Sequence, residues 1–261
     1  MSSSSHREDL DIALEMADAA DAITSSFFKD QNLMIETKPD MTPVSEADRS
    51  VERALRGLLF ARRPADSITG EEYGTEGEGV RQWFIDPIDG TKNYVRGIPV
   101  FATLISLVID HSPVVGVVSA PALSRRWHAV SGGGAYLNGR RIGVSSVSNL
   151  TDAQLSIGDV RSFDNVGLSG EYDRLESQVW RVRGFGDFWS HMLVAEGAVD
   201  IAVEAIVAPW DLAALQVIVQ EAGGRFTDFQ GRSRFDGGNA VSSNGVLHDE
   251  VLRLFNPDQL N

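Results

Sequence analysis

The sequence predicts an α/β protein that folds as one compact unit of two packed sub-domains. Its first 130 residues combine two amphipathic helices with a series of strand-like segments, and helices and strands alternate after about residue 146. No linker rich in proline or glycine separates the two halves. We therefore expect an N-terminal α+β sub-domain over residues 1–145, a C-terminal α/β sub-domain over residues 146–261, and a cleft between them.

Helical spacing of apolar residues defines the first two elements, over residues 8–29 and 45–61. Ser45 has the short polar side chain of an N-cap, and Pro64 ends the second helix. Residues 33–43, between the helices, are expected to form a strand and a loop. Strand-like segments follow at residues 67–69, 82–85, 100–109, 113–119 and 125–130, before glycine turns at residues 132–134 and 138–139.

The C-terminal half is predicted to alternate between the two element types. Helices are expected at residues 170–179, 187–197, 211–222 and 246–254. Strands are expected at residues 180–184, 200–203, 225–228 and 240–243. Polar residues follow many of these elements, and side chains at element ends can converge on a cleft.

Composition restricts the classes of function. The formal net charge of −14 repels nucleic acid and anionic membranes. The absence of cysteine excludes disulfides and thiolate metal sites. The start of the chain lacks the features of a signal peptide, and the longest apolar run, residues 98–109, is too short to span a bilayer. We expect a cytoplasmic protein that acts on a small molecule, with no nucleic-acid or membrane partner.

The segment Asp86-Pro87-Ile88-Asp89-Gly90-Thr91 is the most informative motif in the chain. Two carboxylates flank a proline turn, after the strand-like residues 82–85 and before a short helical segment at residues 92–96. Carboxylates are hard oxygen ligands for an ion such as Mg²⁺, and the amides of Gly90 and Thr91 at a helix start can bind an anion. Asp-Pro and Asp-Gly are also ordinary turn dipeptides, so the motif alone leaves a structural role open.

Four further acidic segments are expected near the same cleft. They are Glu46-Ala47-Asp48, Gly70-Glu71-Glu72, Gly186-Asp187 and Trp210-Asp211. Acidic runs usually form solvated surface, and Asp187 and Asp211 each suit the N-cap of a helix. Each segment therefore has two possible roles, a surface or capping role and that of a ligand in a shared metal site.

Three of these segments resemble the signature motifs of the inositol monophosphatase superfamily. They are Gly70-Glu71-Glu72, the segment from Asp86 to Thr91, and Trp210-Asp211-Leu212-Ala213-Ala214, in the family's order and at its usual separations. Residues 43–48 and 223–224 also fit, and the resemblance extends from about residue 8 to residue 254. It implies a layered αβαβα sandwich with the active site between its two halves.

The resemblance also implies a metal site that is held mostly by the N-terminal sub-domain. Glu71, Asp86 and the Ile88 carbonyl would ligate one Mg²⁺ ion. Asp86, Asp89 and Asp211 would ligate a second ion, with Asp86 bridging the two, and Glu71 would hold a third ion through water. Oxygen-only ligands favour Mg²⁺ or Mn²⁺ over zinc, and carboxylates crowded together repel one another strongly without divalent cations.

By resemblance, the reaction is direct hydrolysis of a phosphate monoester by an activated water. The metal ions would clamp the phosphate and lower the pKa of that water. Thr91 and Asp48 would position the water and accept its proton, and Glu71 would help to orient it. The Gly90 and Thr91 amides would stabilise charge on the phosphoryl group. No Ser-His-Asp or cysteine nucleophile is visible, so no covalent phospho-enzyme is expected. Helix capping is the alternative for Thr91.

Residues 183–188, Arg-Gly-Phe-Gly-Asp-Phe, help to choose the phosphate ester. Inositol-specific members of the family usually carry a small or hydroxyl residue where this chain has Asp187, and a carboxylate there suits an ammonium group. Together with residues 190–197 and 240–250, this segment looks like the branch of the family that hydrolyses L-histidinol phosphate in histidine biosynthesis.

Asp187 and Glu204 would then recognise the amine and the imidazole of the substrate. Asp89, Asp211 and Arg183 complete the predicted substrate-binding set. Arg183 could instead pair with Asp187, and Asp187 could instead cap a helix.

Two other functions stay open. One is an inositol-1-phosphate-type phosphatase of broader range, and the other is a non-catalytic binding protein that keeps the fold. His191, inside an apolar helix, is expected to be a hydrogen-bonded packing residue, and the tryptophans are expected to build the core and an interface. Because relatives are commonly dimers, we expect a homodimer.

Overall fold

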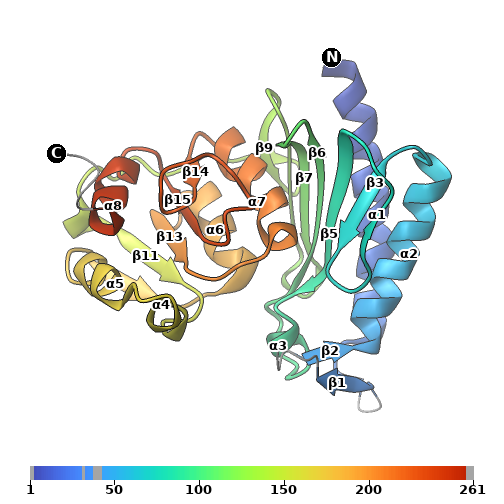
Figure 1. Cartoon of the computed structure of the whole chain (residues 1–261), viewed down its shortest axis with the longest axis horizontal. Helices are drawn as coiled ribbons and strands as arrows, with labels where there is room; N and C mark the ends of the chain where they lie inside the picture. The colour runs from blue at the N-terminus through green and yellow to red at the C-terminus, as the bar shows by residue number, and fades with distance from the viewer. Residues whose placement is uncertain (1–2, 31–32, 38–42, 257–261) are drawn as a thin grey trace.

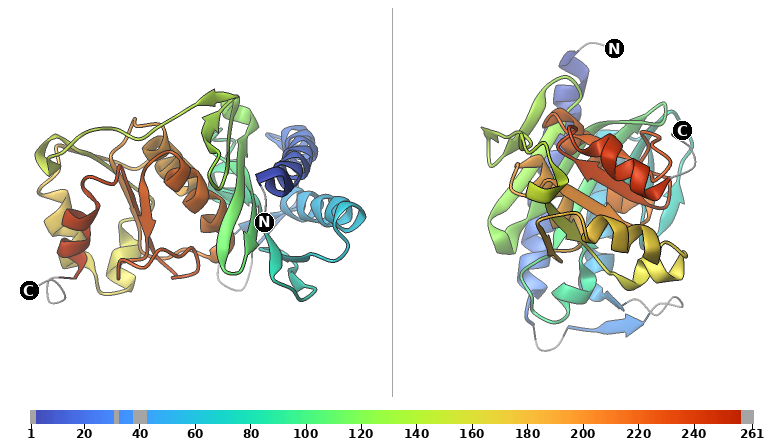
Figure 2. Two further views of the ribbon diagram at one scale, coloured as in Figure 1. Left: turned by 90° about the horizontal axis from the view of Figure 1, so that it is seen from above. Right: turned by 90° about the vertical axis from the view of Figure 1, so that its left-hand side faces the viewer.

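The computed structural model describes residues 3–30, 33–37 and 43–256, and its elements stack in five layers in the order αβαβα (Figure 1). Helices cover both outer faces, and a central pair of helices separates two sheets, as the view from above also shows (Figure 2). The layered sandwich implied by the resemblance is thereby confirmed. None of the helices in the described ranges is both long and apolar enough to cross a membrane.

The outermost layer next to the first sheet consists of α1 (Ser3–Phe27) and α2 (Glu46–Arg62), as predicted. Their apolar faces bury residues such as Met16 and Leu55 against the sheet residue Trp83. Ser45 is the N-cap of α2, and it forms a reciprocal capping box with Asp48. Before α2, β1 (Ile35–Thr37) pairs with β2 (Pro43–Ser45), and residues 38–42 of the predicted strand and loop lie outside the described residues.

The first sheet has eight strands within the described residues. In order across the sheet they are β10 (Arg140–Arg141), β9 (Gly134–Leu137), β8 (Arg125–Val130), β7 (Ser112–Ala120), β6 (Ala102–Ile109), β5 (Arg81–Asp89), β3 (Ser67–Gly70) and β4 (Gly74–Glu76). The sequence did not predict the short strands β4, β9 and β10. The pairing is antiparallel except between β3 and β5, which run parallel. Their carboxyl ends therefore meet at one edge, where the amide of Glu71 donates to the Ile85 carbonyl at 3.3 Å.

The central layer contains α6 (Asp187–Ala195) and α7 (Pro209–Glu221), which pack against the inner face of the first sheet. Nearly every side chain of α7 from Leu212 to Val219 is buried, as expected for a helix between two sheets. The helix approaches β7 so closely that a Cβ at Gly116 would lie 2.7 Å from the Ala214 carbonyl oxygen. Only glycine fits this crossing.

The second sheet has five strands in the described residues. In order they are β12 (Arg181–Arg183), β11 (Gln154–Ile157), β13 (Ile201–Glu204), β15 (Ala240–Ser243) and β14 (Arg225–Thr227). The outer face of this sheet is covered by α4 (Arg161–Asn165), α5 (Ser169–Glu176) and α8 (His248–Phe255). Strand β11, which the sequence did not predict, runs parallel to both neighbours, so the residues after β11, β12 and β13 gather at one edge.

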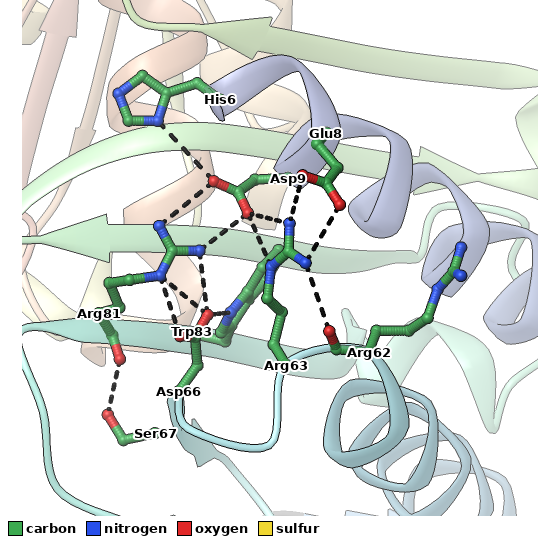
Figure 3. A network of polar contacts seen from close by, with 9 residues as sticks. All are labelled: His6, Glu8, Asp9, Arg62, Arg63, Asp66, Ser67, Arg81 and Trp83. Atoms are coloured by element: carbon green, nitrogen blue, oxygen red, sulfur yellow. Dashed lines mark hydrogen bonds and ion pairs between the residues drawn. The ribbon is translucent and has the colours of Figure 1, made fainter. Parts of the chain in front are cut away.

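A buried polar network attaches α1 to the first sheet (Figure 3). Asp9 of α1 is 1% exposed and accepts a hydrogen bond from Arg81 of β5 at 2.8 Å. Asp66, in the turn before β3, accepts from Arg81 at 2.9 Å and from the Trp83 indole at 2.9 Å. Because both carboxylates are paired with arginine, the network holds the helix end in one place without an unpaired buried charge.

The connection between the two sheets runs over residues 142–153, between β10 and β11. It includes a short 3₁₀ turn at Leu150–Asp152. The predicted sub-domain boundary after residue 145 falls inside this connection, and the division into two sub-domains stays a prediction.

Candidate active site

Three carboxylates from both halves of the chain meet between the two sheets. Oxygen atoms of Asp86, Asp89 and Asp211 all lie within 4.8 Å of one another. Asp86 and Asp89 come from the end of β5, and Asp211 comes from the first turn of α7. The residues that the resemblance assigned to one metal ion are thus adjacent in the fold.

Local hydrogen bonds shape the end of β5. The Asp86 carboxylate accepts the amide of Ile88 at 2.9 Å, and the pairing of β5 with β6 shifts register between Asp86 and Asp89. Gly90 then has a positive φ of 82° as the residue before α3 (Thr91–Tyr94), the short helical segment predicted at residues 92–96. A Cβ on Gly90 would also lie 2.9 Å from the Val100 carbonyl oxygen, so both conformation and space require glycine here.

Asp211 occupies a different helical position from the one predicted. Helix α7 begins at Pro209, so Asp211 is the third residue of the helix and not its N-cap. Its Oδ2 reaches back to accept the Ala208 amide at 2.8 Å. Proline at the first position of α7 explains the earlier start, because its missing N–H is not needed there. The capping hydrogen bond orients Asp211 toward the cluster of carboxylates.

Glu71 is close enough to the cluster to reinforce the effect of burial, which raises the pKa of Asp86 and Asp211, although it is not one of the three carboxylates whose oxygens lie within 4.8 Å of one another. A buried acid that sequence reasoning missed supports the turn that carries Glu71. Glu52 of α2 is fully buried, and its carboxylate accepts the amides of Glu72 at 2.7 Å and Tyr73 at 3.2 Å. Arg56 pairs with Glu52 at 2.7 Å. Glu52 therefore fixes the turn that carries Glu71. It lies on the same helical stripe as Asp48, Leu55 and Leu59, which is the signal that could have revealed it.

The electrostatics of the site fit a bound cation. Burial, reinforced by Glu71, Asp89 and Asp211, raises the pKa of Asp86 well above its usual value. Burial and Asp187 do the same for the pKa of Asp89. Burial raises the pKa of Asp211 to about 7, against the opposing effect of the Ala208 amide. Desolvated carboxylates that repel one another are typical of a site for a divalent cation that prefers oxygen ligands.

Thr91 and Asp48 lie next to each other at the edge of the cluster. The Thr91 hydroxyl is 2.9 Å from the Ile88 carbonyl oxygen and 3.2 Å from Oδ1 of Asp48. The other oxygen of Asp48 accepts the amide and the hydroxyl of Ser45 in the capping box. Burial raises the pKa of Asp48 although these hydrogen bonds oppose the shift. The Thr91 hydroxyl therefore lies within hydrogen-bonding distance of an Asp48 carboxylate that binds a proton more readily than usual.

A cavity of about 430 Å³ is lined by two of the three carboxylates, Asp89 and Asp211. Five acidic residues and one lysine are among its described lining residues: Asp89, Asp159, Asp187, Glu204, Asp211 and Lys92. Lys92, Asn93 and Asp159 are lining residues that sequence reasoning missed. Lys92 and Asn93 directly follow the Asp86–Thr91 motif, which could have pointed to them.

Asp187 faces this cavity as the first residue of α6. Gly186 is the N-cap of that helix, so the alternative capping role for Asp187 is wrong. Its Oδ2 accepts the Asn93 amide group at 3.2 Å, and its φ of 49° lies in the left-handed region. Burial and Glu204 raise the pKa of Asp187 to about 6, and Lys92 opposes this shift. A strained backbone and a desolvated carboxylate together indicate a functional position.

Arg183 is placed apart from the other predicted substrate residues. It does not line the cavity, and its exposed guanidinium donates to the neighbouring Val182 carbonyl at 2.7 Å. No ion pair joins it to Asp187 among the described residues. We therefore leave Arg183 out of the set that is proposed to touch the substrate.

Glu204, at the end of β13, lines the same cavity as Asp187. The side chain of Glu204 is 12% exposed, whereas that of His191 is 0% exposed. Nε2 of His191 lies 3.3 Å from Oε2 of Glu204. The other ring nitrogen of His191 lies 2.8 Å from the Ser242 hydroxyl. The expectation that His191 is a hydrogen-bonded packing residue is confirmed.

Comparison with known proteins identifies this constellation. The model of the inositol monophosphatase family matches residues 5–258. The chain belongs to the inositol monophosphatase family. The family is metal-dependent and hydrolyses phosphoric monoesters, which agrees with the carboxylate cluster.

Relatives of this family member align over almost the whole chain. It is 51% identical to a histidinol-phosphatase of Streptomyces coelicolor, over 95% of this chain and 97% of the relative. It is 52% identical to a histidinol-phosphatase of Mycobacterium tuberculosis, over 95% and 98%. A solved inositol monophosphatase of Thermotoga maritima superposes with a TM-score of 0.85 at 33% identity, covering 96% of this chain and 97% of that one.

Proposed function

We propose that this protein hydrolyses L-histidinol phosphate to L-histidinol and phosphate in a Mg²⁺-dependent reaction of histidine biosynthesis. The observation that carries the proposal is the acidic cavity beside the cluster of Asp86, Asp89 and Asp211. Histidinol phosphate combines a phosphate, which needs metal, with an amine and an imidazole, which suit carboxylates. The identity of 51% and 52% to two histidinol-phosphatases supports the same substrate.

Asp86, Asp89 and Asp211 would hold Mg²⁺, with Glu71 and the Ile88 carbonyl as further ligands. When bound, the metal neutralises the phosphate and lowers the pKa of water. Mn²⁺ would substitute because it accepts the same oxygen ligands. The amides of Gly90 and Thr91, at the start of α3, stay the predicted contacts of the phosphoryl group.

Thr91 and Asp48 would act on the attacking water. In this proposal the Thr91 hydroxyl donates to Asp48, so its lone pairs are free to accept from a water and to orient it. The raised pKa of Asp48 favours its role as proton acceptor. The water then attacks phosphorus directly while one of its protons passes to Asp48, and the ester P–O bond breaks. The histidinol oxygen takes up a proton from a solvent water, and Asp48 returns its own proton to solvent.

Asp187 and Glu204 would recognise the alcohol part of the ester. Both line one cavity, and both belong to the half of the chain that contributes a single carboxylate to the metal cluster. Asp187 at the start of α6 would bind the ammonium group, and Glu204 would bind the imidazole or a hydroxyl.

A substrate panel tests this function. The purified protein with Mg²⁺ should hydrolyse L-histidinol phosphate with a higher kcat/KM than inositol 1-phosphate, and EDTA should abolish both reactions. A higher kcat/KM for inositol 1-phosphate would instead support the broader inositol-phosphatase function. A protein that hydrolyses no phosphate ester with Mg²⁺ and is insensitive to EDTA would support a non-catalytic binding role.

We also propose that the active protein is a homodimer. Trp83 and Trp127 are fully buried in the core, whereas Trp180 is 65% exposed and is available to contribute to an interface. Light scattering after size-exclusion chromatography should give twice the chain mass of 28.4 kDa. A mass equal to one chain at micromolar concentration would reject the dimer.

A further inference from the structure

His191 lies in the interior of the molecule, where it connects the second sheet to the cavity. The residue is on α6, and its ring is 0% exposed. Its Nδ1 lies 2.8 Å from the Ser242 hydroxyl of β15, and its Nε2 lies 3.3 Å from Oε2 of Glu204 at the end of β13. The ring of Phe226 packs against it at a centroid distance of 5.6 Å.

For a neutral ring, the hydrogen-bonding partners determine the tautomer. An ionised Glu204 can only accept, so Nε2 carries the proton and donates it to Oε2. Nδ1 of the neutral ring is then an acceptor, and the Ser242 hydroxyl donates to it. Ser242 is itself 0% exposed, so the neutral ring has buried partners on both sides and one tautomer that satisfies them.

This arrangement also fixes the Glu204 carboxylate. While Oε2 accepts from His191, Oε1 lies against Gly158 so closely that a Cβ there would be 2.9 Å away. Gly158 and Glu204 both line the cavity. His191 thus holds Oε2 of Glu204, and Gly158 limits the movement of Oε1. The lone pairs of the carboxylate that His191 does not use remain available to a ligand in the cavity.

We infer that His191 is a positioning residue that aims the Glu204 carboxylate at the alcohol part of the substrate and thereby sets the preference for a cationic alcohol. The inference rests on the proposed function. Both ring nitrogens of a buried histidine need partners, and at His191 one of those partners is a carboxylate that lines the cavity. Because this partner, Glu204, faces the cavity, the hydrogen bond from His191 gives His191 a role in recognition.

A double-mutant cycle tests the inference, with the variants His191→Leu, Glu204→Gln and both together. The two esters compared are L-histidinol phosphate and p-nitrophenyl phosphate, whose leaving group has no cation. His191→Leu should lower kcat/KM for histidinol phosphate about tenfold, the effect of one charge-assisted hydrogen bond, chiefly through KM. Turnover of p-nitrophenyl phosphate should change by less than about twofold, because the metal cluster is untouched.

In the Glu204→Gln background, the His191→Leu effect on histidinol phosphate should fall below about twofold. Equal losses with both esters, or an undiminished loss in the Glu204→Gln background, would overturn the inference. These outcomes differ from failure of the proposed function, in which the unaltered protein itself would not prefer histidinol phosphate.

A measurement on the unaltered protein keeps the inference testable if His191→Leu does not fold. The ¹⁵N shifts of the His191 ring should show a protonated Nε2 and an unprotonated Nδ1, and Glu204→Gln should move the Nε2 resonance. A ring protonated on Nδ1 alone, or an Nε2 resonance that is insensitive to Glu204→Gln, would overturn the inference whatever the substrate is.

Discussion

The backbone amide of Phe188 donates a hydrogen bond of 2.7 Å to Oδ2 of Asp89. This bond joins the start of α6 to the end of β5, although the two residues are 99 positions apart in the chain. It also places Asp187, which faces the cavity, directly beside a member of the carboxylate cluster. A shift of the start of α6 would therefore move both Asp187 in the cavity and Asp89 in the carboxylate cluster.

Replacing Asp187 with asparagine should weaken recognition of the cationic ester specifically. The amide keeps the size of the side chain and can still interact with Asn93, but it loses the charge that attracts an ammonium group. We expect KM for L-histidinol phosphate to rise about tenfold, with a smaller effect on p-nitrophenyl phosphate. Asp173→Asn, on the exposed face of α5, is the matched control. Equal losses with both esters would mean that Asp187 is structural.

The stability of the metal-free protein should decrease as the pH rises from about 4 to about 7. The pKa of Asp211 is raised to about 7, and those of Asp86 and Asp89 are also raised. A carboxyl group whose pKa is higher in the folded state binds more protons when folded, so its contribution is present at low pH and is lost as the pH rises through the folded pKa. Each pKa unit corresponds to about 1.4 kcal/mol.

Thermal unfolding at pH 5, 6, 7 and 8 checks this expectation. In EDTA the Tm should fall across the series, and Mg²⁺ should restore it most at pH 8, because the metal takes the place of the protons. Asp211→Asn should flatten the curve in EDTA. A Tm in EDTA that rises between pH 5 and pH 8 would contradict the prediction.

Asp86→Asn should separate stability from function. Removing one of the crowded charges relieves repulsion in the metal-free protein, and the new side-chain amide would retain an oxygen to accept the Ile88 amide. We expect the Tm in EDTA to rise by roughly 2–4 °C, which corresponds to about 1 kcal/mol. Activity with saturating Mg²⁺ should fall at least about a thousandfold, since several kcal/mol of metal stabilisation are lost. A variant with unchanged activity would show that Asp86 holds no essential metal.

Thr91→Val and Thr91→Ser test the water-positioning role. Valine keeps the shape of threonine but lacks the hydroxyl that contacts Asp48. We expect kcat to decrease about a hundredfold or more in Thr91→Val, the range of general acid–base effects, and to recover largely in Thr91→Ser. Calorimetry should show that Thr91→Val still binds Mg²⁺. If Thr91→Val keeps its activity while Thr91→Ser loses it, the methyl group matters and the hydroxyl does not.

Gly70→Ala should disturb the turn that carries Glu71. A Cβ at Gly70 would lie 2.1 Å from Oε1 of the buried Glu52, whose carboxylate is held by the Glu72 and Tyr73 amides and by Arg56. We expect a loss of about 1–3 kcal/mol in the free energy of unfolding, together with reduced Mg²⁺ affinity. Gly57→Ala is the control, because a Cβ there meets nothing within 4 Å on the exposed face of α2. It should stabilise the protein by about 0.5–1 kcal/mol. Denaturant unfolding measures both changes.

Motifs predicted the cluster of carboxylates better than they predicted its surroundings. Asp86, Asp89 and Asp211 could be assigned from short segments because each segment has its own recognisable composition. The turn around Glu71 depends on Glu52, which is 20 positions from the Glu72 amide that it accepts. Such a contact forms only when α2 packs on the sheet, and no local pattern encodes it.

Strand β11 shows a second limit of the sequence. It has four residues, Gln154–Ile157, and its pairing with β12 and β13 is parallel, so both partners lie far away in the chain. Neither its length nor a flanking turn distinguishes it from a loop. The predicted start of α7, at residue 211, lies two residues after the observed start at Pro209. The reason is simpler: the prediction places Pro209 before the helix, although proline is favoured at the first helical position.

The arrangement of the cavity walls has a consequence for how this scaffold can diversify. Asp187 begins the helix that follows β12, and Glu204 ends β13, so both lie at the edge of the second sheet. Asp86 and Asp89 lie at the end of β5 in the first sheet, and Thr91 follows them. A lineage could therefore exchange one alcohol for another by altering the edge of the second sheet, while the hydrolytic apparatus at the end of β5 is inherited unchanged. The Phe188–Asp89 hydrogen bond restricts such changes. A change that moved the Phe188 amide would also move the Asp89 carboxylate and so disturb the metal cluster.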